Sequence, residues 1–68
     1  MSGFTKEIIA RTFTELLEEK SMAKITVKDI VERCGVNRNT FYYHFRDIPD
    51  VVEFILKKKW DEILEAPQ

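Results

Sequence analysis

The stretch Thr26-Val27-Lys28-Asp29-Ile30-Val31-Glu32-Arg33-Cys34-Gly35-Val36-Asn37 holds a helix start, a helix and a helix stop. Thr26 and Asp29 form a shortened capping box, in which each side chain accepts a hydrogen bond from the backbone amide of the other residue. The apolar residues between them and the stop recur at helical spacing on one face: Val27, Ile30, Val31 and Cys34. We therefore expect a helix over 27–34, with Cys34 as a small core residue.

A second short helix is expected directly after this one. Gly35 ends the first helix because glycine adopts the left-handed conformation without steric cost. An apolar residue follows, and Asn37 can then cap a helix over 38–45. The phenylalanines of that helix, Phe41 and Phe45, are four residues apart and are expected to point into the core. This order of elements is the sequence form of a helix-turn-helix.

Two further helices flank this pair. Thr5 is expected to cap a first helix that runs to about Lys20, and its apolar stripe consists of Ile9, Phe13, Leu16 and Leu17. Residues 21–24 form a connector, from which Met22 is expected to return into the core.

A fourth helix is expected over 48–64. Asp47 can cap it, and Pro49 is tolerated in a first helical turn because the missing N–H has no partner there. Its apolar residues cover more than one face, and Trp60 belongs to the surplus. That surplus indicates contact with a partner that this chain lacks, or self-association of the chain.

The remaining side chains of the helix over 38–45 form its outward face: Arg38, Asn39, Thr40, Tyr42, Tyr43 and His44. None is acidic, whereas an exposed face with a purely structural role usually mixes Glu and Lys. Arginine can bridge two acceptors of guanine, asparagine can pair with adenine, and hydroxyl and imidazole groups can donate to phosphate. This composition favours a nucleic-acid-binding face. The alternative is a set of aromatic side chains that packs on a neighbouring protein.

Charge is unevenly distributed along the chain. The net charge is −1, but residues 20–46 hold six bases and two acids, which gives this basic segment a charge of +4. Because local charge is what meets phosphate, the basic segment is compatible with DNA binding. A solvated surface with uneven charge would give the same count.

The chain contains few residues of the types that form catalytic or metal sites. One His and one Cys without a ligand-spaced cluster predict neither an enzyme nor a metal or cofactor site. The single Cys, the absence of a signal-peptide pattern and the absence of a long apolar run predict a cytoplasmic protein with no membrane segment. A protein-interaction module that uses Tyr42, Tyr43, Trp60 and the fourth helix is the alternative function.

The segment 25–45 closely resembles the signature of TetR-family transcription regulators. The resemblance rests on Thr-Val-x-Asp-Ile at 26–30, Gly-Val at 35–36 and Thr-Phe-Tyr-Tyr-His-Phe at 40–45. It implies an all-α fold, with a homeodomain-like three-helix helix-turn-helix bundle over 1–47 and a connecting fourth helix over 48–68. It also implies that this helix leads to a larger ligand-binding and dimerisation domain, so that the end at 66–68 is expected to be a cut.

The resemblance further implies which residues touch DNA. Base reading is expected at Arg38, Asn39 and Tyr43, and phosphate contacts at Thr40, Tyr42 and His44. At the start of the preceding helix, Thr26 is expected at a phosphate and Lys28 at the DNA backbone or a flanking base. Asn37, which can cap the helix over 38–45, is also expected to be a DNA-binding residue. Two positions depart from the family pattern: Ile48 stands where a lysine often touches phosphate, and Ser21 where glycine is common.

The expected partner is double-stranded DNA with a pseudo-palindromic operator. In a full-length homodimer, two such heads would insert their third helices into successive major grooves. Bound near a promoter, the dimer would block polymerase as a repressor, or less often recruit it. A small-molecule effector would act only through the larger domain, by changing the spacing of the heads.

Overall fold

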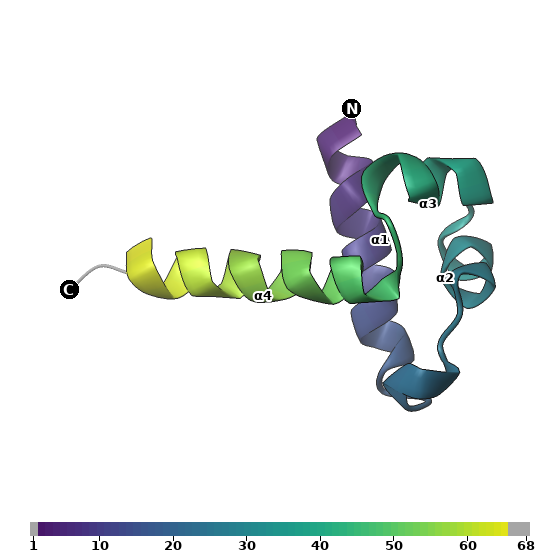
Figure 1. The fold of residues 1–68 in the computed structure, drawn as a ribbon, viewed down its shortest axis with the longest axis horizontal. Helices are drawn as coiled ribbons and strands as arrows, with labels where there is room; N and C mark the ends of the chain where they lie inside the picture. Colours follow the sequence, from purple (N-terminus) through teal and green to yellow (C-terminus); the bar gives the residue numbers. More distant parts are fainter. Residues whose placement is uncertain (1, 66–68) are drawn as a thin grey trace.

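The computed structural model describes residues 2–65, with side chains from 4 to 64. This part of the chain contains helices and no strand: α1 (Ser2–Leu16), the short 3-10 helix η1 (Met22–Lys24), α2 (Val27–Cys34), α3 (Arg38–His44) and α4 (Ile48–Glu65). Helices α1, α2 and α3 pack into one bundle, and α4 starts against α1 and then extends away from the bundle (Figure 1). The all-α prediction, with a helix-turn-helix followed by a fourth helix, is confirmed.

The core draws on every α-helix. Its fully enclosed members are Ile9 and Phe13 from α1, Ile30 from α2, Phe41 from α3 and Val51 from α4. The remaining buried apolar residues are Ala10, Leu16, Ile25, Val31 and Phe45. The inward orientation predicted for Phe41 and Phe45 is thus confirmed, although α3 ends at His44 and Phe45 is the residue directly after it. Cys34 is half-buried and packs against the same cluster.

The first helix differs from its prediction at both ends. Thr5 lies inside α1 and does not cap it, and α1 ends at Leu16 rather than near residue 20. After Leu16 the backbone tightens into i→i+3 hydrogen bonds, such as Glu19 N–H to the Leu16 carbonyl oxygen at 2.9 Å. Leu17 N–H still donates to the Phe13 carbonyl oxygen at 3.1 Å, but Leu17 lies just beyond the end of α1 and is 43% exposed. Met22, expected in the core, is also 43% exposed because η1 turns it outward.

Helices α2 and α3 have the ends that their caps predict. Thr26 Oγ1 accepts from Asp29 N–H at 3.1 Å, and the Asp29 carboxylate accepts from Thr26 N–H at 3.0 Å. Gly35 closes α2 at φ +77°, with its N–H donating to the Val31 carbonyl oxygen at 2.9 Å. Asn37 then caps α3. The turn of the helix-turn-helix is therefore fixed on both sides by local hydrogen bonds.

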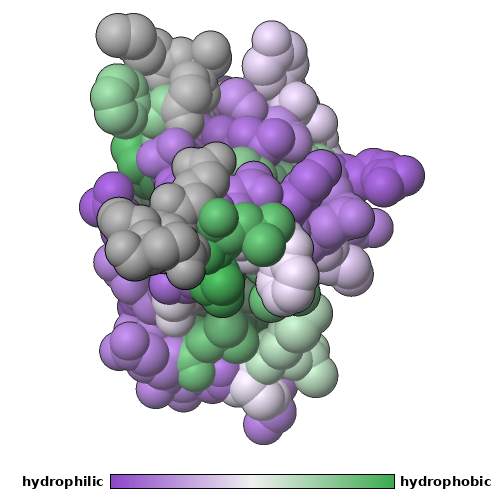
Figure 2. All heavy atoms as spheres, turned by 90° about the vertical axis from the view of Figure 1, so that its left-hand side faces the viewer, coloured by the Kyte–Doolittle hydropathy of each residue, from purple (hydrophilic) through white to green (hydrophobic). Residues whose placement is uncertain are grey.

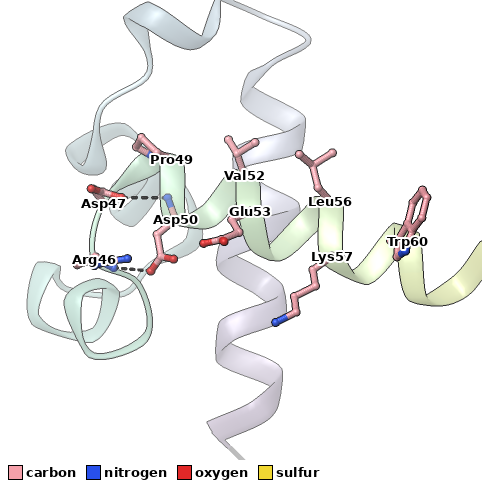
Figure 3. Close-up of a pocket in the computed structure, with 9 residues that line it drawn as sticks. All are labelled: Arg46, Asp47, Pro49, Asp50, Val52, Glu53, Leu56, Lys57 and Trp60. Atoms are coloured by element: carbon pink, nitrogen blue, oxygen red, sulfur yellow. Dashed lines mark hydrogen bonds between the residues drawn. The ribbon is translucent and has the colours of Figure 1, made fainter.

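Two carboxylates accept backbone hydrogen bonds at the start of helix α4. The Asp47 side chain accepts from Asp50 N–H at 2.9 Å, and the Asp50 side chain accepts from Arg46 N–H at 2.8 Å (Figure 3). The first half of α4 packs on the bundle, whereas its second half exposes large apolar side chains. Residues 66–68, which the expected fourth segment included, lie outside the described residues.

Candidate nucleic-acid interface

The outward side of α3 presents its polar side chains in three rows. Residues four apart lie on the same side of a helix, so they pair as Asn39 with Tyr43, Arg38 with Tyr42, and Thr40 with His44. The row of Asn39 and Tyr43 lies opposite the buried Phe41, and Tyr43 is 81% exposed. The other two rows flank it. The structure thus brings together on one short helix all six of the side chains predicted there.

Aromatic contacts hold two of these rings in place. Tyr42 stands edge-on to the buried Phe41, with ring centroids 5.2 Å apart. Tyr43 stands edge-on to His44, at 5.0 Å. Edge-to-face contact is a favourable arrangement of aromatic rings, so each of the two tyrosine rings has a stabilising aromatic neighbour on α3.

Asn37 and Thr40 are already hydrogen-bonded to each other. Asn37 Oδ1 accepts from the Thr40 N–H at 2.8 Å and from the Thr40 hydroxyl at 3.0 Å. The Asn37 amide nitrogen remains available as a donor. The Thr40 hydroxyl would have to turn away from Asn37 before it could donate to a phosphate. The first role of both residues is therefore the capping of α3.

Thr26 and Lys28 lie at the start of α2. The Thr26 hydroxyl accepts from Asp29 N–H, which leaves its own hydrogen free to donate. Lys28 Nζ is 3.9 Å from Glu32, and both side chains are about two-thirds exposed. Such a long, solvated contact contributes little, so Lys28 can leave Glu32 for a phosphate at small cost.

Ion pairs neutralise part of the basic segment. Its paired bases are Arg33 with Glu19 at 2.6 Å, Lys20 with Asp29 at 3.2 Å and Lys28 with Glu32 at 3.9 Å. The acids of the last two pairs are already subtracted in the count of +4, whereas Glu19 lies outside the basic segment, so its pair with Arg33 lowers the charge free to meet phosphate by one. Among the described residues, Lys24, Arg38 and Arg46 form no ion pair.

The two shorter pairs bind the turn after α1 to α2. Arg33 donates from its two terminal nitrogens, Nη1 and Nη2, to the Glu19 carboxylate, and this interaction lowers the pKa of Glu19 and raises that of Arg33. The pKa of Asp29 is lowered first by the hydrogen bond from the Thr26 backbone and then by Lys20. Both carboxylates therefore favour their charged forms in the folded chain.

Sequence reasoning did not place Lys24 and Arg46 at the interface. Lys24 ends η1 and Arg46 follows α3, and both side chains are exposed. The count of bases in 20–46 included them, but neither lies in a recognisable motif. What distinguishes them is the absence of a carboxylate partner among the described residues, which only the structure shows.

The arrangement suits a polymer more than a small molecule. A groove of about 770 Å³ runs along α4, but its lining includes none of the outward side chains of α3 (Figure 3). Among the described side chains, no group of three His, Cys, Asp or Glu residues is placed to hold a metal ion. The outward side chains of α3 carry hydrogen-bond donors and lie apart from this groove.

Comparison with known proteins decides the family. The family model described as "Bacterial regulatory proteins, tetR family" matches residues 6–53, which include α2, α3 and the start of α4. The chain belongs to the tetR family. This tetR-family domain is accordingly a DNA-binding domain of transcription regulation by family, as the signature at 25–45 predicted.

Named bacterial relatives agree with this membership. The chain is 29% identical over 63 residues to the HTH-type dhaKLM operon transcriptional activator DhaS of Lactococcus lactis, covering 93% of the chain and 34% of DhaS. It is 29% identical over 62 residues to the uncharacterized HTH-type regulator YxbF of Bacillus subtilis, covering 90% of the chain and 16% of YxbF. It is 37% identical over 41 residues to YerO of the same organism, another uncharacterized HTH-type regulator, covering 60% of the chain and 14% of YerO.

This tetR-family chain thus spans about a third or less of the length of these relatives. No solved structure matches it significantly. No helix in the described part of the chain is both long enough and apolar enough to span a bilayer.

Proposed function

We propose that this chain is the sequence-specific head of a cytoplasmic regulator that reads the major groove with α3. The observation that carries the proposal is the outward face of α3, where all six side chains are hydrogen-bonding or cationic and none is acidic. Arg38 and Asn39 begin the helix, are exposed and have the chemistry to read guanine and adenine edges. Tyr43, which is 81% exposed, lies one turn after Asn39.

Phosphate contacts would surround this reading face. We assign them to Thr26 and Lys28 at the start of α2, and to Thr40, Tyr42 and His44 on the sides of α3. Lys24 and Arg46 are added because both are exposed cations without an ion pair in the described part of the chain. Asn37 acts mainly through the cap that sets the start of α3.

The whole protein would act as a homodimer on a pseudo-palindromic operator. Two α3 helices in successive major grooves require half-sites about one helical turn, or 34–36 Å, apart. The relatives are about three or more times longer than this chain. A further domain that accounts for this additional length would join the two DNA-binding domains of the homodimer and bind a small-molecule effector.

We further propose repression as the outcome of binding, because a dimer that covers a promoter excludes polymerase. The relative DhaS is named as an activator. A promoter-reporter measurement with and without the full-length protein distinguishes repression from activation. Lower reporter output supports repression, whereas higher output would show that the protein is an activator.

The test of DNA reading is operator selection followed by fluorescence anisotropy. Duplexes enriched from a random pool would be titrated with the chain across a salt series, beside scrambled duplexes. Arg38→Ala is expected to reduce the preference for the selected duplex by about 10-fold, because one bidentate base contact discriminates by roughly 1–3 kcal/mol. Lys28→Ala is expected to weaken both duplexes alike and to reduce the salt slope by about 1.

Arg11→Ala is the matched control, because Arg11 lies in the groove between α1 and α4. It removes one cation and should leave both duplexes as tightly bound as before. Equal affinity for selected and scrambled duplexes in the wild-type chain would refute sequence-specific reading. Unchanged preference in Arg38→Ala would remove that residue from the reading face.

A further inference from the structure

Helix α4 packs on the rest of the described chain only near its start. Val51 is fully buried and Phe54 packs against the core, whereas Trp60, Ile63 and Leu64 are each 61–65% exposed. Viewed along α4 from its free end, hydrophobic atoms gather near the middle of the face, with hydrophilic atoms around them (Figure 2). The direction in which α4 leaves the bundle (Figure 1) is therefore set by the contacts that it makes close to the bundle.

One side chain of α1 contacts aromatic rings from two other parts of the fold. Lys6 Nζ lies 4.9 Å from the ring centroid of Phe54, on α4, and 5.3 Å from that of Phe45, directly after α3. A cation is attracted to the face of an aromatic ring within about 6 Å of its centroid. The two rings are themselves edge-on to each other, with centroids 5.6 Å apart. The ammonium group of Lys6 thus joins α1, the end of α3 and α4 at one point.

The surroundings of Lys6 favour this contact over an ion pair. The side chain is half-buried, and no carboxylate among the described side chains lies within 4.0 Å of its Nζ. Asp50 and Glu53 line the same pocket of about 210 Å³, but the Asp50 carboxylate already accepts a hydrogen bond from a backbone N–H. Because partial burial strengthens the attraction between a cation and a ring, we expect the two rings to be the main partners of this ammonium group.

A second contact between α1 and α4 is expected to be weaker. Glu7, the residue after Lys6, pairs at 3.4 Å with Lys58, which lies one turn after Phe54, and both charged side chains of the pair are about half exposed. An ion pair between solvated groups contributes little, because water screens it and both side chains lose conformational freedom. Of these two contacts, the one made by Lys6 is therefore expected to be the stronger.

We propose that Lys6 is a positioning residue, which fixes the direction of α4 relative to α3 through its contact with Phe45 and Phe54. Loss of its charge would let α4 change direction without unfolding the bundle, because the fully buried residues Phe13 and Phe41 do not depend on it. The contact itself is independent of DNA. Its consequence rests on the function proposed above: in a longer regulator, the direction of α4 would decide how the two α3 faces are placed on the operator.

The test is the distance between two nitroxide labels, measured by pulsed electron paramagnetic resonance on the chain without DNA. The labels are attached at Glu32→Cys on α2 and Asp61→Cys on α4, both exposed positions, in a Cys34→Ala background that leaves no other thiol. Lys6→Met keeps an unbranched apolar side chain and removes the charge. It is expected to raise the fraction of chains outside the main distance peak by about 2- to 5-fold, the change that a partly exposed cation–π contact supports. Lys6→Arg retains a cation and should give the wild-type distribution.

Two further variants test whether Lys6 acts through the ring of Phe54. Phe54→Leu keeps an apolar side chain without a ring and should change the distances as Lys6→Met does. The double variant should change them no further, because both substitutions remove the same interaction. Glu7→Gln is the matched control, since it removes the ion pair with Lys58 and should leave the distances nearly unchanged. Circular dichroism of each variant confirms that the helices remain folded.

An unchanged distance distribution in Lys6→Met would overturn the proposal. So would a change in Lys6→Arg as large as that in Lys6→Met, or a larger change in Glu7→Gln than in either. A DNA titration across a salt series tests the competing role of Lys6 as a phosphate contact. Lys6→Met should keep the wild-type salt slope, whereas a slope lower by about 1 together with unchanged distances would assign Lys6 to a phosphate instead. Because the distances are measured without DNA, they stand or fall separately from base reading by α3.

Discussion

Replacement of Gly35 tests whether the left-handed turn sets the helix-turn-helix. Gly35 has φ +77° and ψ 23°, where L side chains are strained. A Cβ built at this position would meet nothing within 4 Å. The whole cost of Gly35→Ala is therefore conformational, with no steric part. Gly35→Asn provides the matched comparison, since asparagine enters the left-handed region more readily than alanine.

The expected cost of Gly35→Ala is about 1–2 kcal/mol in the free energy of unfolding. A chain of this length has a total of about 3–10 kcal/mol, so the loss is a substantial fraction. For a domain of this size, each kcal/mol lowers Tm by about 4–8 °C. Gly35→Asn should lose about half as much, because its side chain is better tolerated at positive φ.

Urea unfolding followed by circular dichroism measures both variants. The midpoint should fall in the order wild type, Asn, Ala, with the dependence on urea unchanged. At a temperature where all three are folded, their affinities for DNA should agree, because the variants alter the stability of the turn and no DNA-facing side chain. A Gly35→Ala chain as stable as wild type would refute the left-handed assignment. Equal losses in both variants would show that an atomic contact, and not φ, controls the position.

Three other perturbations follow from the structure. Thr26→Ala removes the hydroxyl that accepts from Asp29 N–H and should cost about 1 kcal/mol in urea unfolding, whereas Thr26→Ser should cost little. Phe41→Ala empties the centre of the core and should cost about 3–5 kcal/mol, so that its circular dichroism spectrum at 25 °C reports a largely unfolded chain. The pKa of Asp29 is lowered by folding, so its contribution to stability is complete above about pH 5 and is lost as pH falls through its folded pKa. Asp29→Asn should therefore flatten the acid side of a pH–Tm profile, and an unchanged profile would contradict this account.

The elements that the sequence predicted well are those with caps. Helix α2 has the predicted bounds because the capping box at Thr26 and the glycine at position 35 act locally. Asn37 fixes the start of α3 in the same way. The start of α4 after Asp47 was likewise predicted, and the Asp47 side chain accepts from Asp50 N–H. Each of these signals lies within three or four residues of the helix start or helix end that it sets.

The elements predicted less well lack such local signals. No glycine, proline or cap marks the end of α1, so the stripe of Leu16 was extended to Leu17, which instead turns outward. The pairing of Arg33 with Glu19 joins residues fourteen apart and depends on how α2 crosses the end of α1. Periodicity contains no information about that crossing. The composition of the α3 face could be predicted, but the share of the basic charge that remained unpaired could not.

The pairing of Arg33 and Lys20 with carboxylates has a consequence for how such a regulator finds its operator. Affinity for arbitrary DNA grows with the number of cations that displace counterions, and each cation held by an acid of its own chain is lost from that number. We therefore expect this domain to have a low affinity for the many competing non-specific sites of the genome. More of the protein then stays free in solution, and occupancy of the operator depends chiefly on the bases that α3 reads. Conversion of Glu19 to Gln would release Arg33, and the same head would then be retained longer on the rest of the chromosome.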